Sequence, residues 1–300
     1  MSNTVLSIEL FDTGRADGEG KTRNETPGQV HRAMITNRNN GLFRIDVKME
    51  TCIHGEWAKD DPTPASFMVF QCEVNSLEEY RVRKLKLRWE FVNGEGTPGQ
   101  EPANPAIEAL GPHLTRRYNR SLVNHQVEKE GEVGLEGAEA APIKPVAKMR
   151  LNFSKEFEKH YYEEVQAMAD PPDGNTQRRT RAEWLFKQNS QLNEGIVPAF
   201  RVAVLLKRKT NAPFQGLFTL TEFDAGFRYK LAESWDDFYH SREPNVDDPV
   251  NFVPGKDDVG DRDLIKEVKH SLGQLKSETG GVDQQHAWLW LVDAGDEPSG

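Results

Sequence analysis

The sequence predicts a mainly β protein, an antiparallel β-sandwich with long loops and an acidic, partly helical C-terminal tail. Several segments alternate between apolar and polar residues, which is typical of strands with one face on a core and one in water. The connectors at residues 12–29, 93–105 and 169–177 are rich in Gly, Pro, Asn and charge. They are too long for tight hairpins, so we expect some strands to connect across two packed sheets. The predicted division is a sandwich at residues 1–255 and a tail at residues 256–300.

The alternating segments identify the strands in chain order. An N-terminal strand is expected at residues 4–11, followed by half-buried strands at residues 42–50 and 83–91. Their inward positions are Phe43, Ile45, Val47 and Met49 in the former, and Leu85, Leu87, Trp89 and Phe91 in the latter. Residues 66–74 begin apolar on both faces, which predicts a strand near the centre of a sheet.

Residues 146–169 fit two interpretations. Odd-numbered apolar residues alternate along the segment, which favours a long strand. From Phe157 onward, however, the apolar residues also fall at helical spacing among good helix formers. We favour a strand, with a break into helix after Ser154 as the alternative.

The segment at residues 194–223 is expected to form a hairpin. Phe200, Val202 and Val204 lie on one face of its first run, and a turn at residues 209–213 precedes a second apolar run. Pro198 falls before the strand, where its missing N–H costs little. A structural role therefore explains the segment without a functional site.

The C-terminal third is expected to combine helix with an apolar end. Residues 234–241 suggest a short helix capped by Ser234, and residues 261–277 suggest an amphipathic helix interrupted by Gly273. The chain ends in an apolar run that either docks as a strand or binds a partner. Its predicted partner-binding residues are Trp288, Leu289, Trp290 and Leu291.

The net charge of −10 falls entirely in the C-terminal part of the chain. Residues 233–300 hold 16 acidic and 6 basic residues, so residues 1–232 are balanced. This distribution argues against a nucleic-acid-binding protein with a broad basic face. The N-terminus lacks the features of a signal peptide, and no stretch approaches the roughly 18 apolar residues of a membrane span. We therefore expect a cytoplasmic protein, although basic clusters at residues 81–88, 114–120 and 176–181 could bind a membrane surface if they converged.

The motifs leave the catalytic residues, if the protein is an enzyme, unknown, and they predict no cofactor and no metal site. Phosphate-binding loops, nucleophile elbows and the H-E-x-x-H zinc motif are missing. Cys52 and His54 share a face of a strand by their spacing, but nothing in the sequence completes a catalytic triad. The acidic stretch at residues 245–263 does not follow the calcium-loop pattern and is interpreted as a solvated linker.

One block resembles a known group of proteins. GIVPAFRVAVLLKRKTNAPF, at residues 195–214, resembles a G-[IV]-P-x-[FL]-R-x-A-x-L-L-x-R segment of uncharacterised intracellular proteins of filamentous fungi. The similarity covers roughly residues 40–225 and includes RKLKLRWEFVN, LGPH and AEWLFKQN, whereas VEKEGEVGLEGAEAAPIKP is more charged than the Gly-rich stretch expected there. The resemblance implies a β-strand arrangement and assigns no activity or functional residue.

These observations favour a non-enzymatic binding or interaction module of the cytoplasm. In the first hypothesis, the apolar terminal segment binds a protein partner or a second copy of the chain. In the second, residues 146–169 form an amphipathic hairpin that inserts into a bilayer. In the third, an enzyme acts on a small molecule in a cavity of the sandwich.

Overall fold

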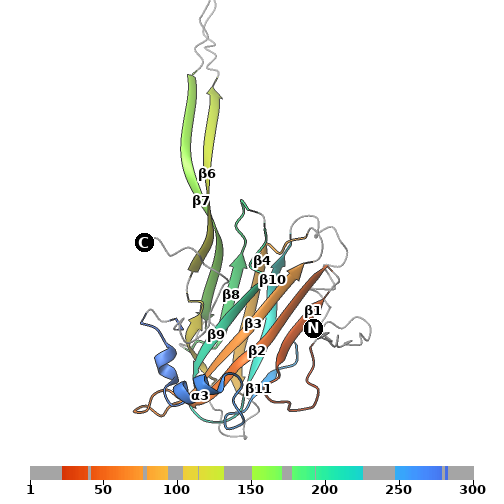
Figure 1. Ribbon diagram of the computed structural model, residues 1–300, viewed down its shortest axis with the longest axis vertical. Coiled ribbons are helices and arrows are strands. Elements are labelled where there is room, and N and C mark those ends of the chain that lie inside the picture. Colours follow the sequence, from red (N-terminus) through yellow and green to blue (C-terminus); the bar gives the residue numbers. More distant parts are fainter. Residues whose placement is uncertain are drawn as a thin grey trace, which may run out of the picture.

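Two antiparallel β-sheets pack face to face in the computed structural model (Figure 1). The structure describes residues 22–39, 42–76, 80–93, 104–113, 115–131, 151–170, 178–192, 194–225, 247–278 and 281–282, with the backbone alone at 115–131 and 151–162. The five-stranded sheet contains, in spatial order, β1 (Met34–Asn39), β2 (Phe43–Glu56), β3 (Pro64–Ser76), β9 (Ala199–Lys207) and β5 (Ala106–Gly111). The six-stranded sheet contains β11 (Val250–Phe252), β10 (Phe214–Asp224), β4 (Lys84–Asn93), β8 (Arg181–Lys187), β7 (Leu151–Asp170) and β6 (Thr115–Gly131). The predicted antiparallel β-sandwich is confirmed.

The core between the sheets consists of the alternating apolar residues of both. The inward positions predicted in β2 and β4 are all buried. Across the sandwich, the Trp89 ring of β4 stacks on the Phe70 ring of β3, with centroids 4.4 Å apart. The strand predicted at residues 66–74 is the central one of the five-stranded sheet, as its two apolar faces indicated.

The hairpin predicted at residues 194–223 is wrong in its pairing, although both strands exist. β9 pairs with β3 and β5, whereas β10 pairs with β4 and β11 in the other sheet. Two strands that face one core from opposite sheets show the same alternation as two neighbours in one sheet. Ala203 and Leu205 are apolar residues on the second face of β9, and both are buried under the C-terminal part of the chain. In the sequence they indicated a strand that is covered on both faces.

Residues 151–170 form one continuous strand, so the helical alternative after Ser154 is wrong. β7 pairs with β6 from Leu151 to Gln166 and with β8 from Glu164 to Asp170. Interstrand hydrogen bonds thus override the local helical spacing. Beyond the part that β8 supports, β6 and β7 project from the sandwich as a two-stranded ribbon (Figure 1).

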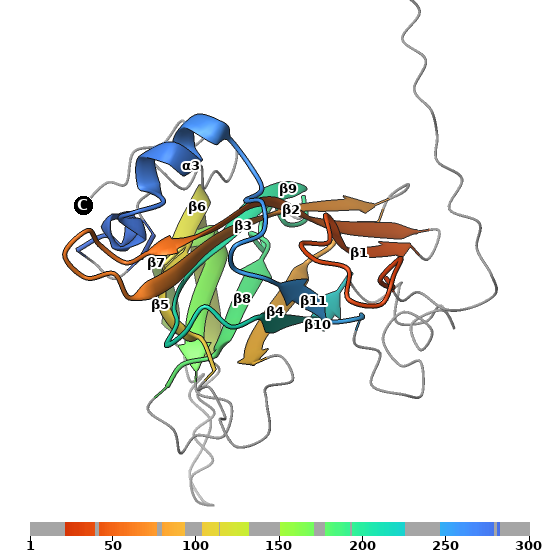
Figure 2. The ribbon, with the colours of Figure 1, turned by 90° about the horizontal axis from the view of Figure 1, so that it is seen from below.

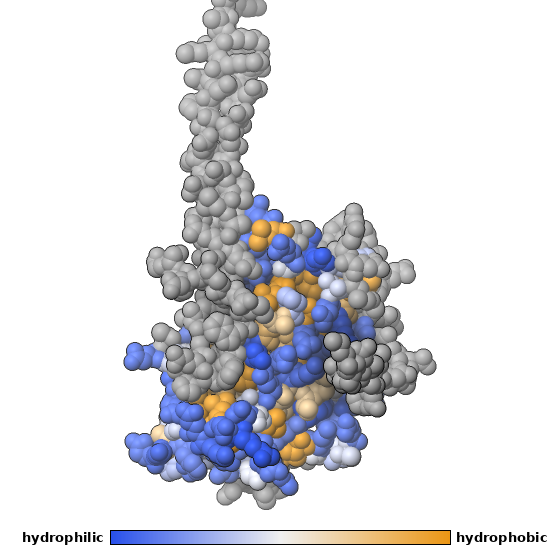
Figure 3. Space-filling view, in the orientation of Figure 1, coloured by the Kyte–Doolittle hydropathy of each residue, from blue (hydrophilic) through white to orange (hydrophobic). Residues whose placement is uncertain are grey.

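The C-terminal part of the described chain packs on the outer face of the five-stranded sheet (Figure 2). The helix expected at residues 261–277 is split into α3 (Arg262–Val268) and the 3-10 helix η1 (Leu272–Leu275). Gly273 allows η1 to approach the sheet, because a Cβ there would lie 2.7 Å from the Trp57 ring. In the view of Figure 3, hydrophilic residues dominate the end of the molecule that carries α3.

The predicted boundary at residue 255 stays a prediction. Residues on its C-terminal side contact the sandwich directly, and Val259 forms a bridge with Cys52 of β2. The strand expected at residues 4–11, the helix expected at 234–241 and the apolar end lie outside the described residues. No helix in the described ranges is both long and apolar enough to cross a membrane.

Candidate functional site

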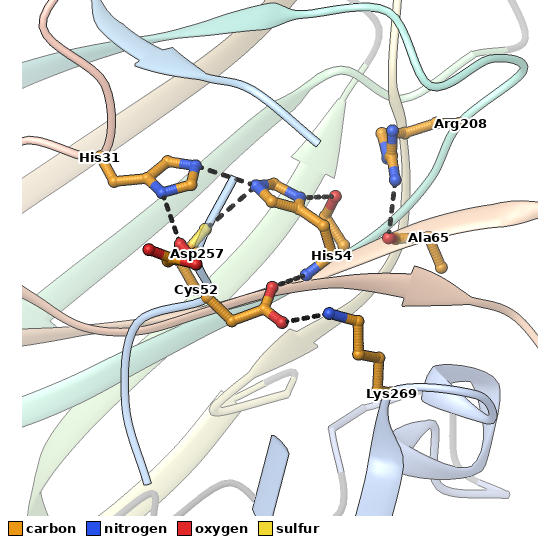
Figure 4. A network of polar contacts seen from close by, with 9 residues as sticks. His31, Cys52, His54, Ala65, Arg208, Asp257 and Lys269 are labelled. Carbon is orange, nitrogen blue, oxygen red and sulfur yellow. Dashed lines mark hydrogen bonds and ion pairs between the residues drawn. The ribbon is translucent and has the colours of Figure 1, made fainter. Parts of the chain in front are cut away.

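Three side chains with metal-binding atoms converge between the sheets (Figure 4). Nε2 of His31 lies 3.1 Å from Nε2 of His54, and Sγ of Cys52 lies 3.5 Å from the same atom of His54. One donor atom from each residue falls within 4.8 Å of the other two. We call His31, Cys52 and His54 the three-donor cluster.

A β-bulge in β2 turns two of these residues toward the core. Odd-numbered residues of β2 face inward as far as Met49, and the register with β3 shifts between Met49 and Thr51. Beyond the shift, Cys52 belongs to the inner core and Ile53 to the apolar cluster on the outer face. A bulge adds one residue to a strand and so exchanges its two faces. Without it, the alternation would point Cys52 and His54 outward.

His31 reaches the cluster from the segment that precedes β1. Its backbone φ is 50°, which is uncommon for a residue other than glycine. The conformation is held by its N–H, which donates to the Asn251 carbonyl at 2.9 Å, and by its ring, which lies 6.1 Å from the ring of Phe252. Strained backbone of this kind concentrates at functional sites.

The Nδ1 atoms of both histidines already have hydrogen-bond partners. Nδ1 of His31 faces the Asp257 carbonyl at 3.2 Å, and Nδ1 of His54 faces Oγ of Ser66 at 2.8 Å. A carbonyl only accepts, so Nδ1 of His31 carries the proton and its Nε2 offers a lone pair. Val253 N–H donates to that lone pair at 3.4 Å.

His54 then has two tautomers open to it. Either its Nε2–H donates to Nε2 of His31, with the Ser66 hydroxyl donating to Nδ1, or Nδ1–H donates to Ser66 and both Nε2 lone pairs face each other. The second arrangement needs a cation between the rings, because two lone pairs repel at 3.1 Å. Ring nitrogens anchored in this way are typical of metal-ligating histidines.

Burial keeps all three donor residues uncharged. Desolvation is the largest of the causes that lower the pKa of His54 to about 3, and Arg208, His31 and Lys269 contribute to the same shift. Desolvation also lowers the pKa of His31 and raises that of the Cys52 thiol. A protonated thiol beside a neutral imidazole is a poor nucleophile, so the site does not favour cysteine catalysis.

The cluster is enclosed by aromatic and charged residues. The His54 ring lies 5.9 Å from Phe214 and 6.5 Å from Phe252. The guanidinium of Arg208, 4% exposed, donates to the Ala65 carbonyl at 3.0 Å (Figure 4). Asp258 accepts from the His54 N–H at 2.9 Å and from Lys269 Nζ at 2.6 Å.

The donor spacing suits a tetrahedral or trigonal metal ion. Bonds of about 2.0–2.1 Å to nitrogen and about 2.3 Å to sulfur at tetrahedral angles separate two nitrogens by about 3.3 Å and nitrogen from sulfur by about 3.6 Å. The contacts of 3.1 Å between the nitrogens and 3.5 Å from nitrogen to sulfur are close to these values. Motif search could not find this set, because His31 lies 23 residues before His54 in the sequence. The pairing of Cys52 with His54 was the only signal in the sequence.

A separate pocket of about 310 Å³ lies at the end of β3. Its lining contains Arg81 and one carboxylate, Glu194, and no histidine. We expected an enzyme to show an enclosed pocket lined by two or more histidines or carboxylates, and this pocket does not meet that expectation.

Part of the basic cluster at residues 81–88 forms ion pairs within its own sheet. Lys86 and Arg88 contact Glu183 at 2.8 and 2.6 Å. On the same face, Arg181 contacts Glu90 at 3.4 Å. These cations form a charged strand face rather than an anion-binding surface. The side chains of residues 114–120 lie outside those that the structure describes.

In the acidic stretch at residues 245–263, described carboxylates have separate structural roles. Asp247 is 2% exposed and contacts Arg38 at 3.1 Å, so a solvated linker is the wrong description there. Asp261 caps α3 by accepting from the N–H groups of Asp263 and Leu264. The predicted partner-binding residues Trp288, Leu289, Trp290 and Leu291 lie outside the described residues.

No protein-family model and no curated protein matches the chain. The resemblance to fungal proteins stays a prediction, and the site is interpreted from its geometry.

Proposed function

We propose that the protein is a non-enzymatic binding module and that its ligand is a transition-metal ion held by the three-donor cluster. The convergence of two Nε2 atoms and one Sγ atom within 4.8 Å carries this proposal. Second-sphere contacts from Asp257 and Ser66 support it, because they fix both rings with Nε2 directed at the same point.

The donor set favours zinc and copper over calcium and magnesium. Imidazole and thiolate are soft or borderline ligands, whereas calcium and magnesium prefer oxygen. The carboxylate of Asp258 contacts the backbone of His54, but its two oxygens accept from the His54 N–H and from Lys269 Nζ. A fourth ligand of zinc would therefore be water. Binding of the ion would also displace the thiol proton to solvent, because a coordinating cysteine is a thiolate.

Burial favours binding of an ion over conversion of a larger substrate. Cys52 is fully buried and His54 is 5% exposed. Only His31 is partly exposed, so it marks the side from which an ion or a water molecule enters.

Calorimetric titration of the reduced full chain with Zn²⁺ tests the proposal. We expect one ion per chain, and at least a hundredfold weaker binding in His31→Ala, Cys52→Ser and His54→Ala. His270→Ala is the matched control, because its exposed ring contacts Glu56 away from the cluster. Equal affinity in the donor variants and the control would refute the site.

A second candidate function belongs to the ribbon of β6 and β7. From the pair Ser121–Tyr161 to the pair Gly131–Leu151, these strands pair with each other and with no third described strand. A lone two-stranded ribbon is marginally stable in water and leaves both backbone edges open. We propose that it adds a strand to a protein partner or to a second copy of the chain.

Replacing residues 121–161 with a short Gly-Ser turn tests this second function. We expect light scattering to show a smaller assembly, or pull-down to lose the partner, while Zn²⁺ binding is unchanged. Leakage of anionic vesicles by the intact chain but not by the deletion would favour the bilayer-inserting hairpin instead.

A further inference from the structure

The segment at residues 253–259 contacts every member of the three-donor cluster. The Val253 N–H and the Asp257 carbonyl lie against the two ring nitrogens of His31, at 3.4 and 3.2 Å. Asp258 accepts from the His54 N–H at 2.9 Å. The backbones of Cys52 and Val259 exchange two hydrogen bonds of 2.9 Å. The surroundings of the donors are thus built largely by one short stretch of chain.

The same segment leads directly into α3 and η1. Lys269, just after α3, donates through Nζ to Asp258 at 2.6 Å, and its carbonyl accepts from the Glu56 N–H at 2.9 Å. This approach is close enough to require Gly55, since a Cβ there would lie 1.9 Å from the Lys269 oxygen. Docking of α3 therefore depends on the end of β2 that also carries His54.

α3 and η1 cover an apolar face that the sandwich does not bury by itself. The sheet contributes Ile53, Ala65, Phe67, Val69, Ala109, Ala203 and Leu205, and the C-terminal part contributes Val268, Leu272, Leu275 and Val282. All of these side chains are buried in the docked state. If the C-terminal part lifted away, the sheet would expose a contiguous apolar surface.

We propose that metal binding at the three-donor cluster latches residues 253–282 onto the outer face of the five-stranded sheet. The inference rests on the proposed metal site and adds a regulation to it. An ion that bridges His31 and His54 ties the segment before β1 to β2. Coordination at Nε2 leaves the proton of His31 on Nδ1 and makes that N–H a stronger donor to the Asp257 carbonyl. When the ion binds, Nε2 of His31 no longer accepts the 3.4 Å hydrogen bond from the Val253 N–H. The contacts of Asp257, Asp258 and Val259 with the cluster residues are retained.

The coupling works in both directions. If an ion stabilises the docked segment, the docked segment strengthens ion binding by the same factor. Removing the ion then makes the segment open more often and uncovers Phe67 and Leu205, a surface suited to a partner. The concentration of the metal ion would then control how often the outer face of the five-stranded sheet is accessible.

Hydrogen exchange of the reduced full chain, with and without Zn²⁺, tests the latch. We expect at least tenfold slower exchange at residues 253–275 in the presence of the ion. Peptides from β4, in the other sheet, should change much less, which separates a local latch from a general gain in stability.

Asp258→Asn removes the charge that holds Lys269 while leaving all three donors in place. We expect about tenfold weaker Zn²⁺ binding and loss of the ion-dependent protection at residues 253–275. Asp263→Asn is the matched control, because the Asp263 side chain is 95% exposed and contacts the exposed Lys266 at 3.6 Å.

The outcomes separate the latch from the metal site. Zn²⁺ binding by the wild-type chain with unchanged exchange at residues 253–275 would overturn the latch and leave the site standing. The same affinity in Asp258→Asn and Asp263→Asn would also overturn it. Failure of the wild-type chain to bind Zn²⁺ would overturn the metal site, and the latch with it.

Discussion

The Nε2 atoms of His31 and His54 lie 3.1 Å apart, although the two residues come from different segments of the chain. Nε2 of His31 offers a lone pair, because its Nδ1–H is directed at the Asp257 carbonyl. Contact at this distance therefore requires a shared proton or a bridging cation. Sγ of Cys52, 3.5 Å from Nε2 of His54, supplies a third donor and so supports the metal ion that we propose.

Metal affinity should rise with pH by about one proton per ion. The pKa of the Cys52 thiol is raised by burial, so binding must displace its proton, whereas burial lowers the pKa of both imidazoles and keeps them neutral at pH 7. We expect the apparent Zn²⁺ affinity to increase about tenfold per pH unit between pH 6.5 and 8. Titrations in two buffers of different protonation enthalpy measure the released proton. An affinity that does not vary with pH would mean that Cys52 is not a ligand.

Without metal, His54 should make the fold sensitive to acid. Desolvation lowers its folded pKa to about 3, against about 6.5 in the unfolded chain. The unfolded state thus binds the proton first, and stability is full above pH 6.5 and falls as the pH drops toward 3. The loss from this residue is about 1.4 kcal/mol per pH unit.

Urea unfolding with chelator present, from pH 7 to 4, measures this loss. The slope of the unfolding free energy against pH should be steeper in wild type than in His54→Gln by that amount. Other titrating groups contribute equally to both proteins and cancel. Equal slopes would show that His54 is not desolvated.

Gly216 should not tolerate a side chain. A Cβ there would lie 2.7 Å from the Trp89 ring and 2.9 Å from the ring of Phe252. We expect Gly216→Ala to cost about 1–3 kcal/mol of unfolding free energy, the usual cost of an overpacked core. Thr219→Ala, on the opposite face of β10, should cost less than about 1 kcal/mol. Similar losses in the two variants would contradict the packing of Gly216 under Trp89.

Cross-linking distinguishes the observed strand pairing from a hairpin. Ala199 of β9 lies opposite Glu73 of β3, whereas a hairpin with a turn at residues 209–213 would place it opposite Phe223. The double variant Ala199→Cys, Glu73→Cys should form a disulfide on mild oxidation, seen as a shift in non-reducing electrophoresis. Ala199→Cys with Phe223→Cys should stay reduced, and the reverse result would restore the hairpin.

The sequence predicted the elements of the fold better than their pairing. Strict alternation placed Phe43 and Trp89 on the core because burial of one strand face leaves a period of two in the sequence. Alternation carries no information on which strand lies beside which, so β9 and β10 were placed side by side. The helical spacing of apolar residues from Phe157 onward is also a local pattern that carries no information on tertiary contacts. Pairing of β7 with β6 and β8 overrides it.

The candidate site was largely hidden from the sequence for two physical reasons. The bulge between Met49 and Thr51 reverses the faces of β2, and no residue type at the bulge predicts it from the sequence. His31 is brought in by contacts with residues 251–257, more than 200 residues away. The spacing of Cys52 and His54 was visible, but a pair of donors at i, i+2 is common on any strand.

The most direct test of the account is the absorption spectrum of the reduced full chain loaded with Co²⁺, a spectroscopic substitute for zinc. Coordination by Cys52 and two imidazoles predicts a thiolate-to-cobalt charge-transfer band together with intense bands of a low-coordinate ion. The charge-transfer band should vanish in Cys52→Ser and persist in His270→Ala. A wild-type spectrum identical to that of Cys52→Ser would contradict the metal site.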